Sequence, residues 1–130
     1  MNLTSKKIQV NQPAALIFGK LTGSLENYRQ LMPSEVAEFK TDGDTFTFGL
    51  KGFPEVHLKI KETVANQKVT FESFNSPIKF QLSCFIQEIG EGISELQFAF
   101  DGEVNMMMRM MLEKPLQNFI DKLADKAANL

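Results

Sequence analysis

Between residues 36 and 101 apolar and polar side chains alternate with a period of two, which predicts a series of β-strands. Short turns separate the runs, and Asp42-Gly43 is a strong hairpin signal between strands at 36–40 and 45–50. Further strands are expected at 55–62, 69–74, 78–89 and 94–101. Neighbouring strands joined by short turns pair antiparallel. One face of this sheet is apolar and therefore needs a cover.

The chain before this region predicts one more strand and two short helices. Ser5 to Val10 reads as the strand, and Asn11-Gln12-Pro13 as a helix start with Asn11 as the N-cap. The first helix, 14–21, is expected to bury Leu16, Ile17 and Leu21. The second helix is expected at 25–31, before Pro33. The first and second strands of the sheet would thus be separated by two helices.

A long helix from about Val104 to Asn129 is the only predicted element large enough to cover the sheet. Pro115 lies inside it, removes one backbone hydrogen bond and is expected to kink or restart the helix. The residues expected on its buried face are Met108, Leu112, Pro115, Leu116, Phe119, Ile120, Leu123 and Ala127.

Five of the seven methionines lie between residues 106 and 111, at the start of this helix. Methionine is flexible and polarizable, so it lines surfaces that adapt to apolar partners. On a helical wheel we expect Met108 and Met111 to pack against the sheet, with Met107 at the margin. Met106 and Met110 point nearly the opposite way, and solvent, a gate or a partner surface would each explain them.

Composition narrows the classes of function. A chain of 130 residues predicts one domain spanning residues 1–130. A net charge of −2 with scattered lysines argues against nucleic-acid binding. A single cysteine excludes an internal disulfide, and one cysteine with one histidine argues against a zinc site. We expect no metal and no cofactor. No leader or membrane-spanning run is visible, so we expect a soluble cytoplasmic protein without stable membrane insertion.

Three parts of the sequence resemble the START-like (SRPBCC) superfamily, which includes polyketide cyclases and pollen-allergen lipid binders. They are Asn11-Gln12-Pro13 with Ile17-Phe18, then Leu31-Met32-Pro33, and finally Phe98-Ala99-Phe100-Asp101-Gly102 followed by 110–116. The resemblance covers essentially the whole chain. It implies an α+β helix-grip fold, in which a curved seven-stranded antiparallel sheet wraps around the long C-terminal helix, with two short helices between strands one and two.

The resemblance also implies an apolar cavity between the sheet and the C-terminal helix. This chain is short for the superfamily, which favours a small or partly filled cavity. The residues expected to line it are Phe46, Phe48, Leu58, Phe71, Phe80, Leu82, Phe98 and Phe100 from the sheet, with Met107, Met108 and Met111 as an adaptable lid.

Few residues in this sequence are suited to catalysis. Cys84 and His57 fall on opposite faces of the sheet by strand parity, which argues against a nucleophile–base pair. Tyr28, Ser73, Asn105 and Glu38 are the polar groups that could face a cavity. Each of them also has a purely structural interpretation. The Tyr28 hydroxyl can lie in water, Asn105 can cap a helix, and Ser73 can occupy a narrow part of the interior. We therefore predict no catalytic residues.

The function predicted from the sequence is binding of an apolar small molecule, such as a lipid or an aromatic metabolite. Two alternatives stay open at this stage. One is a cyclase- or dehydratase-type enzyme that uses Tyr28 or Glu38. The other is an interaction module, resembling co-chaperone members of the superfamily, that presents Met106 and Met110 to a partner or to a second copy in a homodimer.

Overall fold

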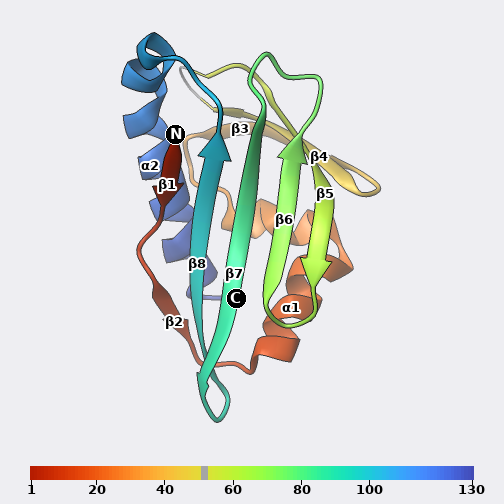
Figure 1. The fold of residues 1–130 in the computed structure, drawn as a ribbon. Coiled ribbons are helices and arrows are strands. Elements are labelled where there is room, and N and C mark those ends of the chain that lie inside the picture. Colours follow the sequence, from red (N-terminus) through yellow and green to blue (C-terminus); the bar gives the residue numbers. More distant parts are fainter. Residues whose placement is uncertain (51–52) are drawn as a thin grey trace.

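In the computed structural model, residues 1–50 and 53–130 are described, and they form one antiparallel sheet flanked by helices (Figure 1). The strands are β1 (Asn2–Thr4), β2 (Ile8–Val10), β3 (Val36–Asp42), β4 (Thr45–Leu50), β5 (Val56–Val64), β6 (Lys68–Ser73), β7 (Phe80–Gly90) and β8 (Ile93–Gly102). The helices are α1 (Ala14–Gly23), the 3₁₀ helix η1 (Leu25–Leu31) and α2 (Met106–Ala127).

The sheet order is β1-β8-β7-β6-β5-β4-β3, and β2 also pairs with β8. The antiparallel hairpins expected from the period-two pattern are all present in this order. Gly43 has a φ of 64°, which confirms the turn predicted at Asp42-Gly43. The helix-grip architecture is therefore confirmed: the sheet curves along one side of α2, and α1 lies near the lower end of the sheet (Figure 1).

Of the first predicted strand, Ser5 to Val10, only β2 (Ile8–Val10) is a strand; a further short strand, β1, precedes it with a break at 5–7, so the described residues form eight strands rather than seven. Ser5 causes the break. Its backbone N–H donates to the Phe98 carbonyl at 2.8 Å, while its hydroxyl accepts from the Phe98 N–H at 2.9 Å and donates to the Lys6 carbonyl. The Ser5 hydroxyl thus takes the place of a backbone carbonyl as the acceptor for the Phe98 N–H. Backbone pairing with β8 resumes only at Ile8.

The start of α1 also differs from the prediction. Asn11 does not cap the helix: Pro13 occupies the N-cap position and makes no side-chain cap bond. Instead the Glu88 carboxylate, from the end of β7, accepts a hydrogen bond from the Ala14 N–H at 2.9 Å. A negative charge at a helix N-terminus is favourable. The buried face of α1 is formed by Ala14, Ile17 and Leu21, so Leu16 is half exposed and the prediction that Leu16 is buried is wrong.

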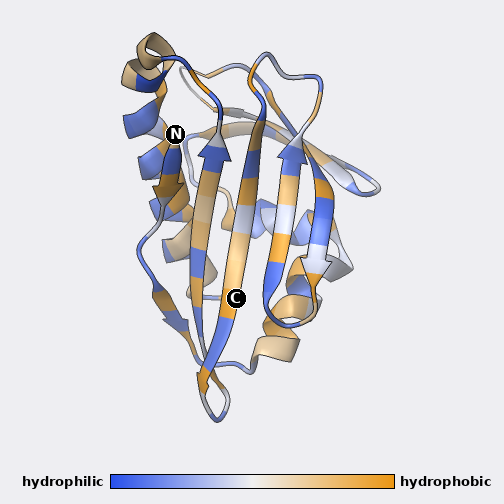
Figure 2. Cartoon of the chain, in the orientation of Figure 1, coloured by the Kyte–Doolittle hydropathy of each residue, from blue (hydrophilic) through white to orange (hydrophobic). Residues whose placement is uncertain are grey.

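The core lies between the concave face of the sheet and the helices. Cross-strand pairs such as Leu82 with Phe100 and Cys84 with Phe98 bring the inward residues into register. Figure 2 shows apolar and polar residues alternating along the sheet strands. The inward predictions for β4, β7 and β8 are confirmed by burial of their alternate residues.

The C-terminal helix α2 runs without interruption through Pro115, so the helix does not restart there. Its N-terminus is capped by Asn105, whose side-chain oxygen accepts from the Met108 N–H at 2.8 Å, as one of the sequence interpretations had it. The residues buried on α2 are Leu112, Leu116, Phe119, Ile120, Leu123, Ala124 and Ala127. All of them lie beyond the methionine cluster.

Candidate functional site

All eight sheet residues predicted to line a cavity are buried on the concave face. Their exposed fractions run from 0% at Leu58 to 7% at Leu82. Four of them surround one interior void, and the other four pack elsewhere in the same core. The void is lined by Tyr28, Met32, Phe46, Phe71, Leu82, Ser83, Cys84, Phe98 and Leu123. It therefore lies where η1 and the second half of α2 meet the sheet.

The void has a volume of only about 10 Å³. A site needs roughly 10–15 Å³ to hold a single water molecule, so an aromatic molecule has no room without movement of the walls. The rings around the void explain this. Tyr28 stacks on Phe46 at 5.4 Å, and Phe71 meets both rings edge-on at 5.2 Å. These offset and edge-on contacts close the core.

Tyr28 lies inside this cluster and not at a wet sheet end. It is 3% exposed, and its hydroxyl donates to the Leu21 carbonyl at 2.9 Å, so the expectation of a hydroxyl in water is wrong. Burial is the main cause that raises the pKa of Tyr28 well above its ordinary value. A neutral phenol that already donates to the backbone is a poor acid or base for an incoming molecule.

Cys84 is a small buried residue in the wall of the void, as the strand parity predicted. Burial raises the pKa of its thiol to about 12, so it stays protonated at neutral pH. Ser73, another candidate, has its hydroxyl donating to the Ile78 carbonyl and accepting from the Phe80 N–H. Glu38 is exposed on β3, at a positive φ of 55° beside an irregularity in the β3–β4 register.

Of the three methionines predicted to form a lid over the cavity, only Met108 contacts the core. Met108 is partly buried against the core, but Met111 is 67% exposed, so the expectation that it packs against the sheet is wrong. Met107 is 72% exposed. Leu123, which does line the void, lies about 18 Å from Met111 along the helix at 1.5 Å per residue. The structure therefore does not bring these methionines to the void.

A methionine outside the cluster occupies the position expected of a lid. Met32 follows η1, lines the void and is only partly buried, whereas the other helix-side residues in the lining are buried. Sequence reasoning overlooked it because it is a single residue in a turn before Pro33. Met32 is thus the adaptable side chain between the interior void and the surface.

The outer face of the sheet carries an ordered polar trio that the sequence analysis did not find. The Thr47 hydroxyl lies 3.0 Å from His57 Nδ1, and a Glu55 carboxylate oxygen lies 3.3 Å from His57 Nε2. The signal was available, since Thr47 and His57 are cross-strand partners. None of the three lines the interior void or a surface hollow found among the described residues, so the trio has the order of a nucleophile, base and acid without a pocket for a substrate.

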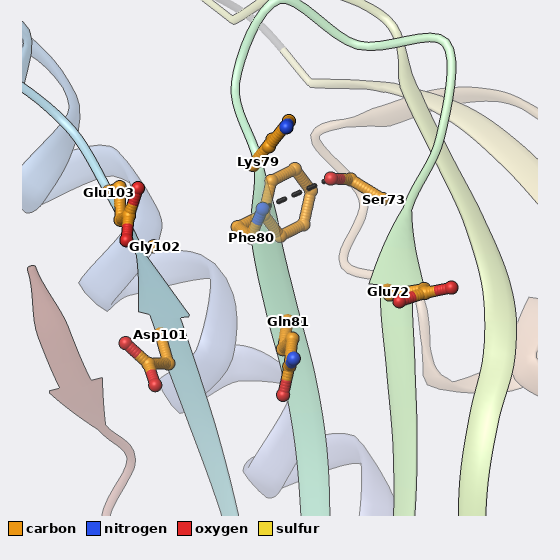
Figure 3. Close-up of a pocket in the computed structure, with 8 residues that line it drawn as sticks. All are labelled: Glu72, Ser73, Lys79, Phe80, Gln81, Asp101, Gly102 and Glu103. Carbon is orange, nitrogen blue, oxygen red and sulfur yellow. Dashed lines mark hydrogen bonds between the residues drawn. The ribbon is translucent and has the colours of Figure 1, made fainter.

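Two hollows open on the surface. One, of about 490 Å³, lies over the ends of β6, β7 and β8 and is lined by Glu72, Ser73, Lys79, Phe80, Gln81, Asp101, Gly102 and Glu103 (Figure 3). The other, of about 710 Å³, lies between the start of α1 and the β5–β6 turn. Both are open to solvent. The first is lined largely by polar or charged residues, which suits water better than an apolar ligand, whereas the lining of the second is half polar and half apolar.

Within the described residues no group of three or more His, Cys, Asp or Glu side chains is placed to hold a metal ion. In the same ranges, 1–50 and 53–130, no helix has the length and apolar character needed to cross a membrane.

Comparison with solved structures identifies the architecture. A norcoclaurine synthase from Thalictrum flavum, in complex with dopamine and hydroxybenzaldehyde, superposes with a TM-score of 0.78 at 13% identity, covering 99% of this chain and 84% of that one. A START superfamily protein from Mycobacterium smegmatis gives 0.67 at 14% identity, covering 98% and 97%. The chain has the START-type helix-grip fold.

A protein from Thermus thermophilus matches over 99% of this chain and 95% of its own, with a TM-score of 0.73 and 12% identity. No family model matches the sequence, and no curated protein matches it. Identities this low establish the shared fold and leave function to be argued from the site.

Proposed function

We propose that this protein binds a small apolar molecule, with an aromatic ring or a short aliphatic chain, in the interior around the void beneath η1 and α2. The role is that of a soluble cytoplasmic binding protein rather than an enzyme. One observation carries the proposal: the void lies where the helices meet the concave sheet, and the flexible Met32 lies between it and the surface.

The chemistry of the lining supports this class of ligand. Phe46, Phe71, Leu82 and Phe98 present apolar surface, and the Tyr28 hydroxyl already donates to the backbone. An uncharged apolar molecule is therefore the partner that such walls accept without leaving a buried polar group unpaired. The norcoclaurine synthase structure, which holds dopamine and hydroxybenzaldehyde in the same fold, supports an aromatic ligand.

Binding requires the site to open, because the closed void holds about 10 Å³. We infer that Met32 rotates outward and that the rings of the wall repack around the ligand. The apparent affinity is then lowered by the small fraction of molecules that are open at any moment. A substitution that enlarges the void removes part of this penalty and should tighten binding.

Tyr28 offers a direct readout, because the chain has one tyrosine and no tryptophan. Bromobenzene quenches fluorescence on contact through its heavy atom, so its binding in the void should quench Tyr28 saturably. Leu123→Ala, which removes side-chain carbons from the wall of the void, should lower the half-saturating concentration by about tenfold. Leu116→Ala is the matched control, since it removes the same atoms from the same helix away from the void.

We expect quenching in the control to match wild type. Organic extraction of freshly purified protein, followed by mass spectrometry, should identify the natural occupant. If neither wild type nor Leu123→Ala shows saturable quenching of Tyr28, the interior does not admit ligands and the proposed function is wrong.

A further inference from the structure

Four exposed methionines, Met106, Met107, Met110 and Met111, form a continuous surface on the first two turns of α2, called here the Met face. Their exposed fractions are 77%, 72%, 80% and 67%. At 100° per residue they span about 140° of the helix circumference, centred opposite the buried residues of the same helix. The Met face therefore points away from the core of this protein.

Exposed apolar surface of this extent calls for a covering partner. At about 25 cal/mol per Å², the free energy of burying a methionine corresponds to roughly 100 Å² of side chain. At their exposed fractions the four methionines therefore expose on the order of 300 Å². That is within the range of patches that mark interaction sites. Two copies face to face would bury about 600 Å² of methionine alone, and the surrounding rim would bring the total toward the roughly 1,200 Å² of a small specific interface.

The charges around the Met face indicate which partner fits. Arg109 and Glu113 pair with each other along one border, at 3.2 Å. Lys114, one turn beyond Met110, and Glu103, just before the helix, are both exposed and make no ion pair with any described residue. The border thus carries two cations and two anions. A border with equal numbers of positive and negative charges fits a partner surface that also carries both signs. An anionic lipid surface would instead favour a border with excess positive charge.

We propose that the Met face is the interface of a symmetric homodimer, in which two α2 helices pack antiparallel across a twofold axis. A twofold contact places the same surface on both sides. With the axis at the centre of the Met face, Met106 lies against the partner's Met111, and Met107 against the partner's Met110. In the same register Lys114 meets the partner's Glu103, twice by symmetry. This proposal does not depend on ligand binding by the interior.

Analytical ultracentrifugation of the full chain over a range from about 1 to 300 µM tests the interface. Wild type should approach twice the monomer mass of 14.7 kDa as the concentration rises. Met106→Glu/Met110→Glu should remain monomeric throughout. Leu16→Glu/Ile89→Glu is the matched control, because it also places two charges on exposed apolar residues but lies off the Met face, and it should dimerise like wild type.

The charge pair tests the register. Lys114→Glu and Glu103→Lys should each raise the dissociation constant about tenfold, since each places like charges opposite one another. The combined variant Lys114→Glu/Glu103→Lys should recover wild-type affinity to within about threefold. A wild type that is monomeric up to 300 µM would overturn the proposal. So would a dimer that survives Met106→Glu/Met110→Glu, additive losses in the charge-swapped variant, or a monomer that sediments with phosphatidylglycerol vesicles through the Met face.

Discussion

The two halves of α2 are both rich in apolar residues but are used in opposite ways. From Leu112 onward the apolar residues are spaced three and four apart and pack on the sheet, so that Ile120 is fully buried. Before Leu112 the apolar residues are nearly consecutive, and four of the five methionines face solvent. Spacing therefore decides burial, and the apolar residues left outside the buried stripe are available for another surface.

The two halves also differ in what they cover. Leu123 in the second half forms part of the wall of the interior void, while the first half extends past that void and carries the Met face. We accordingly assign ligand binding to the interior beneath the second half and self-association to the first half.

Ile120→Ala should lower the free energy of unfolding by about 3 kcal/mol, because the removed atoms leave a cavity in a position with no exposure. Urea denaturation monitored by circular dichroism measures this. A loss below about 1 kcal/mol would mean that the second half of α2 is loosely packed, and the contrast between the halves would no longer hold.

The pH dependence of stability tests whether the interior beneath the second half is dry. The Cys84 thiol pKa rises from 9.0 to about 12 in the folded protein because of burial. A raised pKa means that the folded state holds the proton more tightly. The contribution of the buried thiol to the free energy of unfolding is fully present below pH 9 and is lost as the pH rises from 9 toward 12.

Wild type should therefore lose stability relative to Cys84→Ala by about 1.4 kcal/mol per pH unit above pH 9. Urea unfolding of both proteins at about pH 8, 9 and 10 measures the difference, and pairing the two proteins cancels the effect of Tyr28 and the lysines. Parallel stability curves would indicate that water already reaches the thiol.

Asn105→Ala should destabilise the protein by about 1 kcal/mol, because it removes the only side-chain bond that caps the first turn of α2 among the described residues. Hydrogen exchange should show faster opening of the amides at 107–110 without faster exchange near Ile120. Asn105→Asp serves as the control, since a carboxylate can cap the same turn. Equal acceleration along the whole helix would mean that its two halves open together.

Met107→Gln should change the free energy of unfolding of the monomer by less than about 0.5 kcal/mol, because the side chain is 72% exposed and its length is conserved. Thermal unfolding at about 1 µM, where dimers are few, is the appropriate measurement. A loss above about 1 kcal/mol would show that the first half is packed on the monomer after all.

Much of the fold could be predicted because its signals are local and repeated. Alternation through Phe46 and Phe48, and again through Leu96, Phe98 and Phe100, defines strands and their inward faces without tertiary information. The Asp42-Gly43 turn and the Asn105 cap also depend on neighbouring residues alone. The buried second half of α2 follows from its spacing.

The errors arise where a distant residue determines the local structure. Ser5 breaks the first strand through two bonds to Phe98, and Glu88 takes over the capping of α1 from Asn11. The Tyr28 hydroxyl is buried because the Leu21 carbonyl accepts from it. The sequence carries no local mark of these pairings. The size of the void likewise depends on how tightly the rings interlock, which a pattern of apolar residues does not specify.

Methionine methyl NMR tests the central proposal most directly, because the seven methionines report on both regions at once. Protein with ¹³C-labelled methionine methyl groups is titrated with toluene at about 20 µM, where self-association is weak. We expect the Met32 methyl signal to shift saturably while the signals of Met106, Met107, Met110 and Met111 stay in place. Shifts confined to those four, with Met32 unchanged, would contradict a ligand site in the interior.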